Sequence, residues 1–330
     1  MSADLFRRPP TRREFLTIGT GMFVALSLPL AVRRRMPLVK RSYPLMGTIA
    51  EVQVAHADER RAEAAIDAAL AELLWVDRTM TRFRPDSDIG RVNLGAGREG
   101  VEVSAETALV IEAALHWSSV SEGTFDPALG SASDLWDVLN RHQPPPAGAV
   151  GRLASRGLWR KVDIARRGAG AVVRFEDRDV QLDLGGIAKG YGIDRAVAAL
   201  RRTGIAHAIV TVGGDLYALG RAPDGAPWQV GIRDPHNLDR LAGQLDVADR
   251  AVTTSGDYER FFTWRGVRYH HLIDPRTAAP RRTAMHSVTV QGDNCLNADA
   301  AATAVFGMAT EAARRVARRV LGDADVIPLT

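Results

Sequence analysis

The sequence predicts an α+β fold, with one domain of mixed or antiparallel sheet and packed helices behind an N-terminal export signal. Strand-like runs outnumber helical stretches and cluster in the second half of the chain, which favours α+β over a doubly wound parallel sheet. Hydrophobic residues make up 46% of the 330 residues and charged residues 25%, which is typical of a globular protein with a sizeable core. We assign the signal to residues 1–40 and the folded domain to residues 41–330.

The charge and the cysteine content exclude several classes of protein. The net charge is only +4, and much of the positive charge lies in the first 41 residues. The remainder is therefore near neutral or slightly acidic, and we expect no nucleic-acid partner. Cys295 is the one cysteine, which excludes an internal disulfide and a cysteine-based zinc site.

The N-terminal segment has the pattern of a twin-arginine export signal. Residues 11–16 read T-R-R-E-F-L, and an apolar stretch follows over residues 18–32, too short and broken for a comfortable membrane span. We expect export to the periplasm or to the outer face of the cytoplasmic membrane, with inner-membrane association through this segment. The alternative is an amphipathic helix that contains an arginine pair by chance.

The first half of the domain contains one strand and two helices. Residues 45–55 carry β-branched residues after Pro44 and predict a strand. Apolar residues recur at helical spacing over residues 58–80. Ser104 is a plausible N-cap for a second helix over residues 105–120, and the Pro- and Gly-rich residues 141–151 predict a loop.

The second half alternates short strands with three helices. The helices are expected over residues 187–200, 296–308 and 310–321. Strands are expected near residues 172, 180, 209, 217, 230, 245, 252, 262 and 272 and over residues 288–290.

A glycine-rich turn at residues 182–195, L-D-L-G-G-I-A-K-G-Y-G-I-D-R, is the most informative local feature. It lies between a predicted strand and a predicted helix, where free backbone N–H groups and the positive helix end can hold a phosphate. It matches neither the P-loop pattern nor G-x-G-x-x-G. By itself it is equally well interpreted as a tight turn whose glycines relieve crowding.

Three further clusters carry groups suited to chemistry, and each has a structural alternative. Asp126 lies beside a rigid proline in T-F-D-P, where an Asx turn explains it as well. His271 follows His270 on a predicted strand, so the two point to opposite faces, and either is more often a hydrogen-bonded core residue than a catalyst. Asp299 and Thr303 are spaced i, i+4 on a helix, an oxygen pair that suits Mg²⁺ or, alternatively, a capping aspartate with a back-bonding threonine.

Taken in order, these segments resemble the FAD:protein FMN transferases, the ApbE-type flavin transferase family. Each segment alone is weak evidence, but the ordered set is specific and covers most of residues 43–310. The matching segments are residues 46–48, 81–93, 124–127, 182–194, 212–215, 228–235, 254–262, 270–277 and 287–308.

The resemblance implies a catalytic domain that binds FAD and Mg²⁺ and moves FMN onto a Thr or Ser hydroxyl of a target flavoprotein, releasing AMP. It implies that the Gly186 carbonyl, Asp299 and Thr303 hold Mg²⁺, and that His271 takes the proton of the accepting hydroxyl. The residues that it assigns to FAD are Met46, Phe83, Thr124, Phe125, Asp126, Asp183, Lys189 and Ile273.

Three positions depart from the family pattern, and two other functions remain open. Ala278 replaces the glycine of D-P-x-T-G, Phe83 stands where Tyr is frequent, and Ala128 replaces the Thr usual after Asp-Pro. One alternative is an Mg²⁺-dependent FAD pyrophosphatase, which uses water as the acceptor. The other is a periplasmic flavin-binding protein without turnover.

Overall fold

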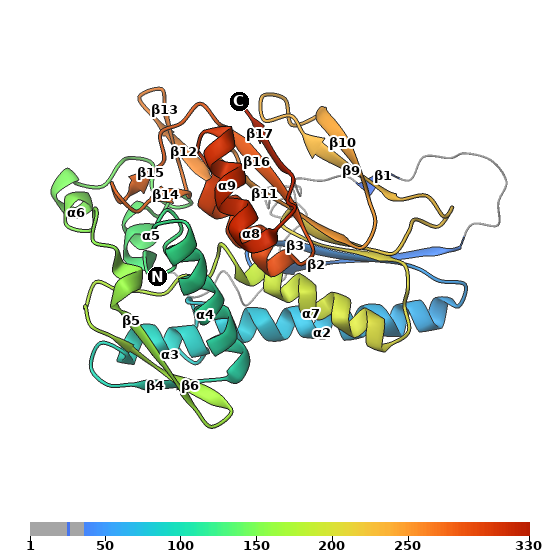
Figure 1. Ribbon diagram of the computed structural model, residues 1–330, viewed down its shortest axis with the longest axis horizontal. Coiled ribbons are helices and arrows are strands. Elements are labelled where there is room, and N and C mark those ends of the chain that lie inside the picture. The colour runs from blue at the N-terminus through green and yellow to red at the C-terminus, as the bar shows by residue number, and fades with distance from the viewer. Residues whose placement is uncertain (1–24, 27–35) are drawn as a thin grey trace.

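The computed structural model describes Ala25–Leu26 and residues 36–330, and the predicted export signal lies almost wholly outside these residues. Its centre is a seven-stranded antiparallel sheet in the order β17-β16-β11-β8-β7-β3-β2, which confirms the predicted α+β class (Figure 1). The strands are β2 (Leu38–Leu45), β3 (Thr48–Ala55), β7 (Ala208–Val212), β8 (Asp215–Leu219), β11 (Arg250–Gly256), β16 (Ser287–Gly292) and β17 (Val326–Leu329).

Four helices pack on or beside this sheet. The long helix α2 (Glu59–Met80) lies alongside α7 (Ala188–Arg202), and α7 in turn packs against α8 (Cys295–Val305) (Figure 1). Helix α8 rests on β11 and β16 and is flanked by α9 (Thr310–Leu321). An apolar stripe on each helix faces the sheet, so burial of that stripe holds the layers together.

The remaining strands form two three-stranded sheets and two two-stranded ribbons, and the longest remaining helix is α4 (Ala105–Val120). The other helices are α3 (Asp88–Gly95), α5 (Gly130–Trp136), α6 (Ala147–Gly151) and the 3₁₀ turn η1 (Leu158–Lys161). The other strands are β1 (Ala25–Leu26), β4 (Val101–Val103), β5 (Val162–Arg167), β6 (Gly170–Phe175), β9 (Trp228–Arg233), β10 (Leu241–Val247), β12 (Phe261–Trp264), β13 (Val267–His270), β14 (Ile273–Asp274) and β15 (Ala279–Pro280).

Most helix predictions are confirmed within a few residues, because capping side chains define the ends. Asp58 accepts the Arg61 N–H at the start of α2, and Ser104 accepts the Thr107 N–H at the start of α4. The helix expected over residues 296–308 is α8, which ends at Val305. The predicted loop at residues 141–151 contains the short α6, and α3 and α5 were not predicted.

One strand prediction is wrong and a second is met by two short strands, and at both places a side chain binds backbone groups that a strand ladder would use. Near residue 180 there is only an isolated bridge from Gln181 to Leu129, and the Asn93 amide binds both the N–H (2.7 Å) and the C=O (2.9 Å) of Leu182. Near residue 272 the strand is interrupted, because the Leu272 N–H donates to His270 Nδ1 (3.2 Å). His271 therefore lies in the bend between β13 and β14 and not on a strand.

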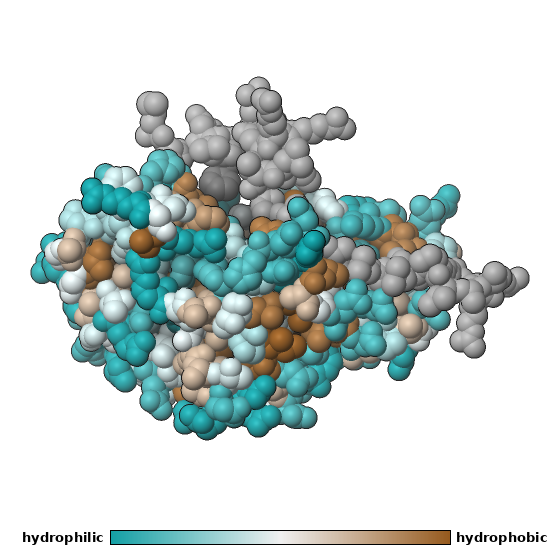
Figure 2. All heavy atoms as spheres, turned by 90° about the horizontal axis from the view of Figure 1, so that it is seen from above, coloured by the Kyte–Doolittle hydropathy of each residue, from teal (hydrophilic) through white to brown (hydrophobic). Residues whose placement is uncertain are grey.

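The surface gives two further facts. Among the residues that the structure describes, no helix is long and apolar enough to cross a membrane. Figure 2 shows apolar residues gathered in the middle of one face and bordered by hydrophilic residues.

Candidate active site

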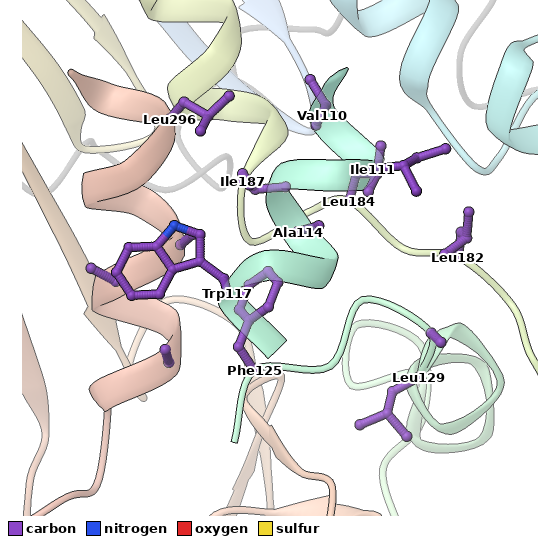
Figure 3. Close-up of a cluster of buried hydrophobic side chains, with 14 of the residues drawn as sticks. Val110, Ile111, Ala114, Trp117, Phe125, Leu129, Leu182, Leu184, Ile187 and Leu296 are labelled. Carbon is purple, nitrogen blue, oxygen red and sulfur yellow. The ribbon is translucent and has the colours of Figure 1, made fainter. Parts of the chain in front are cut away.

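The glycine turn is held rigidly from both sides. Leu184 and Ile187, which flank its first glycine pair, are buried in the same cluster as Trp117 and Phe125 (Figure 3). The Asp183 N–H donates to the Pro127 carbonyl (2.7 Å), and its carboxylate accepts the Gly185 N–H (2.9 Å). The turn therefore presents a fixed backbone at the start of α7.

The glycines also allow α7 to approach α8 closely. A Cβ on Gly190 would lie 2.1 Å from the Cys295 carbonyl oxygen, so only glycine fits there. The Asp194 carboxylate accepts the N–H groups of Cys295 and Leu296, each at 2.8 Å, at the N-terminus of α8. Crowding thus explains why residue 190 is a glycine. The close contact between α7 and α8 that this glycine permits lies at a charged centre.

That centre consists of Lys189 between two buried carboxylates. Lys189 Nζ lies 2.7 Å from Asp215 Oδ2 and 2.9 Å from Asp299 Oδ1, and both aspartates are only 2% exposed. Burial disfavours the charge on Lys189, but the two carboxylates outweigh it and raise the pKa of its ammonium. Burial also raises the pKa of Asp215 to about 7, although Lys189 opposes the shift.

The three residues predicted to hold a metal lie together beside Lys189. Asp299 also accepts the Gly190 N–H (3.1 Å), and the Thr303 hydroxyl lies 3.4 Å from the Ser255 hydroxyl. A Cβ built on Gly186 would lie 3.1 Å from Thr303 Oγ1, which places the glycine turn against the last turn of α8.

The donor chemistry of this set fits Mg²⁺. A carboxylate, a hydroxyl and a backbone carbonyl are hard oxygen donors of the kind that Mg²⁺ prefers. Within the described part of the chain, no group of three or more His, Cys, Asp or Glu side chains is arranged for a metal. A metal here would therefore depend on the Thr303 hydroxyl and a main-chain oxygen as well as Asp299.

The Thr124–Asp126 segment lies against both the glycine turn and α8. Thr124 Oγ1 donates to the Ala304 carbonyl (3.0 Å), and the buried Phe125 ring lies 3.2 Å from the position of a Gly186 Cβ. Asp126 accepts the Ala128 N–H (2.9 Å), which is the Asx-turn contact considered from the sequence. Burial raises the pKa of Asp126 to about 6.

Phe83 and Asp183 are joined through Arg82. The Phe83 ring is 76% exposed and the Arg82 guanidinium lies 4.5 Å from its centroid. Arg82 Nε lies 3.0 Å from Asp183 Oδ2. An exposed aromatic ring beside a charged pair is suited to stack on a planar ring system at the edge of the site.

His271 is connected to the Met46 turn through Arg260. Met46 and Gly47 have φ values of +52° and +68° at the β2–β3 turn, and the Arg260 guanidinium donates to the Gly47 carbonyl (3.1 Å). The Arg260 carbonyl accepts the His271 N–H (3.1 Å) and faces its Nδ1 at 3.4 Å. This carbonyl favours the tautomer with the proton on Nδ1, which leaves Nε2 as the acceptor.

The electrostatic surroundings keep His271 neutral. Burial, followed by the positive charge of Arg260, lowers the pKa of its imidazole to about 3, and Lys189 contributes in the same direction. At neutral pH the ring is therefore a proton acceptor and not a cation.

Sequence reasoning missed residues that support the site from outside its motifs. Asp215 belongs to the matching segment 212–215, and its position directly after a glycine pair was the available signal. Arg260 lies in a matching segment, but nothing in that segment revealed its contacts. Arg281 donates to the carbonyl of Ile273 (3.3 Å), one of the predicted FAD residues, and no sequence signal distinguished it.

Three comparisons with known proteins show the family of this chain. The model of the ApbE family matches residues 46–327. The chain is 35% identical to an FAD:protein FMN transferase of Treponema pallidum (84% of this chain, 81% of the relative) and 32% identical to one of Vibrio cholerae (84% of each). Among solved structures, it is similar to the ApbE protein of Thermotoga maritima (TM-score 0.79, 28% identity, 88% of this chain and 94% of that one) and to the flavin transferase ApbE of Vibrio cholerae (TM-score 0.74, 28% identity, 89% and 93%).

Proposed function

Because this chain belongs to the ApbE family and is a transferase of the FAD:protein FMN type, we propose the Mg²⁺-dependent transfer of FMN from FAD to a Thr or Ser hydroxyl of a target flavoprotein, with release of AMP. One observation supports the Mg²⁺ dependence and the phosphate chemistry of this proposal. Where α7 contacts α8, Lys189 lies beside Asp299, and Thr303 lies beside the turn at Gly186.

The reaction requires charge neutralisation on a pyrophosphate. Bound Mg²⁺ would supply a Lewis acid for the phosphate oxygens, held by Asp299, Thr303 and the Gly186 carbonyl. Lys189 brings a positive charge to the same place, where it offsets part of the negative charge of Asp215 and Asp299. Asp215 keeps that ammonium oriented, since Lys189 Nζ lies 2.7 Å from its carboxylate.

The transfer step also requires removal of one proton. The oxygen of the acceptor hydroxyl forms a bond to the phosphorus of the FMN half of FAD, while the bond from that phosphorus to the bridging oxygen breaks and AMP leaves with the oxygen. His271 Nε2 takes the hydroxyl proton, because Nδ1 is directed at the Arg260 carbonyl and the ring is neutral at pH 7.

The remaining predicted contacts support FAD at its two sides. Phe83 offers an exposed ring for stacking, and Thr124 and Phe125 lie against α8 and Gly186. Met46 lies against Gly192, and Asp183 is part of the glycine turn itself. The twin-arginine pattern of residues 11–16 supports export to the periplasm or to the outer face of the cytoplasmic membrane, where the acceptor would also lie.

One experiment separates this function from its alternatives. The purified chain is incubated with FAD, Mg²⁺ and a candidate acceptor, AMP is quantified, and the acceptor is measured by intact mass. AMP together with an FMN-sized mass increase on the acceptor supports the transferase. AMP without that mass increase indicates the pyrophosphatase, and intact FAD indicates a binding protein.

A further inference from the structure

Arg281 makes an unusual set of contacts beneath the proposed site. Its guanidinium donates to five main-chain carbonyls, which come from three segments far apart in the chain. The acceptors are the carbonyls of Thr124, Ile273 (3.3 Å), Thr303 (3.1 Å), Ala304 (3.4 Å) and Phe306 (2.5 Å). Within the described part of the chain, none of these acceptors is an acidic side chain. The Arg281 guanidinium therefore donates to main-chain oxygens.

Two of these contacts complete the hydrogen bonds at the C-terminal end of α8. The last four carbonyls of a helix have no partner within the helix. In α8, Ala302 accepts the Phe306 N–H and Val305 accepts the Met308 N–H. That leaves the Thr303 carbonyl and the Ala304 carbonyl, of which the second also accepts the Thr124 hydroxyl (3.0 Å). Arg281 donates to both of these.

The positive charge of Arg281 is also correctly placed for this helix end. A cation near the C-terminus stabilises a helix through its dipole, and the last turn of α8, which the structure describes in full, contains no basic residue. Burial lowers the pKa of Arg281 to about 10, so the guanidinium stays charged at neutral pH. Arg281 thus gives α8 a C-terminal cation from another segment.

We propose that Arg281 is a positioning residue that fixes Thr303, Thr124 and Ile273 relative to one another. This inference rests on the proposed function, in which Thr303 contributes to the metal site and the other two to FAD binding. Thr124 is held doubly, since its carbonyl accepts from Arg281 and its hydroxyl donates to Ala304 (3.0 Å). A planar guanidinium with five N–H groups can join three segments in this way, whereas a lysine ammonium with three donors cannot reach all of them.

The test compares Arg281→Met and Arg281→Lys with Arg282→Met. Arg282 is the adjacent exposed arginine, whose guanidinium lies over the Tyr269 ring (4.7 Å to the centroid), so it is a matched control. Hydrogen exchange measured by mass spectrometry on the ligand-free protein reports each segment separately. We expect Arg281→Met to accelerate exchange in peptides covering residues 121–127 and 300–308, while α2 and the central sheet remain protected as in the wild type.

Steady-state kinetics provide the second readout. We expect Arg281→Met to raise KM for FAD by about tenfold or more, the effect expected when buried carbonyls lose a charged donor, and Arg281→Lys to recover part of the loss. Arg282→Met should match the wild type in both measurements.

Each outcome is decisive. Unchanged local exchange, or an unchanged KM in a folded Arg281→Met, would overturn the positioning role, as would accelerated exchange spread evenly over the protein. If neither Arg281 variant folds where Arg282→Met does, Arg281 supports the whole fold and the local role is wrong. If the wild type shows no FAD turnover, the proposed function fails, while the exchange measurement still tests the contacts.

Discussion

Replacing Lys189 with methionine tests the charged centre at the contact of α7 with α8. Methionine keeps most of the side-chain length but removes the charge that lies between Asp215 and Asp299. Both carboxylates are 2% exposed, so water cannot replace the lost partner. Removing one member of a buried ion pair costs about 3–5 kcal/mol, and the presence of two carboxylates places this case toward the upper end.

The loss should be visible as a change in thermal stability. At roughly 2–4 °C per kcal/mol, the expected decrease in Tm is roughly 6–20 °C. The assay is thermal unfolding followed by circular dichroism at pH 7.5 in EDTA, with urea unfolding to obtain the free energy of unfolding directly. Metal-free buffer keeps an added cation from compensating for the missing ammonium.

Lys161→Met is the matched control. Lys161 pairs with Glu176 at 3.4 Å, but these side chains are 46% and 63% exposed, and an exposed pair contributes about 0–1 kcal/mol. The reasoning is refuted if Lys189→Met destabilises the protein no more than this control does.

Three further predictions concern the proposed metal, the base and a buried acid. Mg²⁺ at about 100 times its Kd should stabilise the wild type by about 2.7 kcal/mol, which thermal unfolding detects as a rise in Tm. Asp299→Asn should remove this rise in Tm, whereas Asp293→Asn, a change at an exposed aspartate, should keep it. An equal rise in both variants would exclude Asp299 as a ligand. His271→Ala should retain FAD binding, measured by flavin fluorescence, but lose about 10²–10⁴-fold in transfer, while the exposed His116→Ala retains both; full transfer would make His271 structural. Burial raises the pKa of Asp126 to about 6, so the native state binds more protons than the unfolded state between about pH 4 and 6. As the pH rises through this window, the free energy of unfolding of the wild type should therefore fall relative to that of Asp126→Asn, by at most about 3 kcal/mol. A difference between the two proteins that does not change with pH in urea unfolding would contradict the shift.

The sequence predicted the elements whose signals are local. The N-cap at Ser104 and the helices α2, α4 and α9 depend on neighbours in the chain, and they were located closely. The strand predicted near Val180 was wrong because Asn93, far away in sequence, binds the backbone of Leu182. No local pattern contains that information.

The same distinction applies to the candidate site. The i, i+4 spacing of Asp299 and Thr303 places them on one helix face, and the structure brings Thr303 to Gly186 and Asp299 to Lys189. The pairing of Lys189 with Asp215 follows from the packing of α7 beside β8, which spacing alone does not give. Arg281 was not predicted because its partners are backbone carbonyls, which every residue offers.

The departure at Ala278 shows how such contacts can preserve a turn when its residue type changes. Ala278 has a φ of +51°, in the left-handed region that glycine enters at little cost and alanine at about 1–2 kcal/mol. Its N–H donates to the Asp274 carbonyl (2.7 Å) and its own carbonyl accepts from Trp136 Nε1 (2.7 Å), and the residue is fully buried. Each bond connects the turn to a separate element, so the surroundings offset the strain. The turn between Asp274 and Arg281 therefore keeps its left-handed position without glycine, and the strand carrying Ile273 remains within reach of the Arg281 guanidinium.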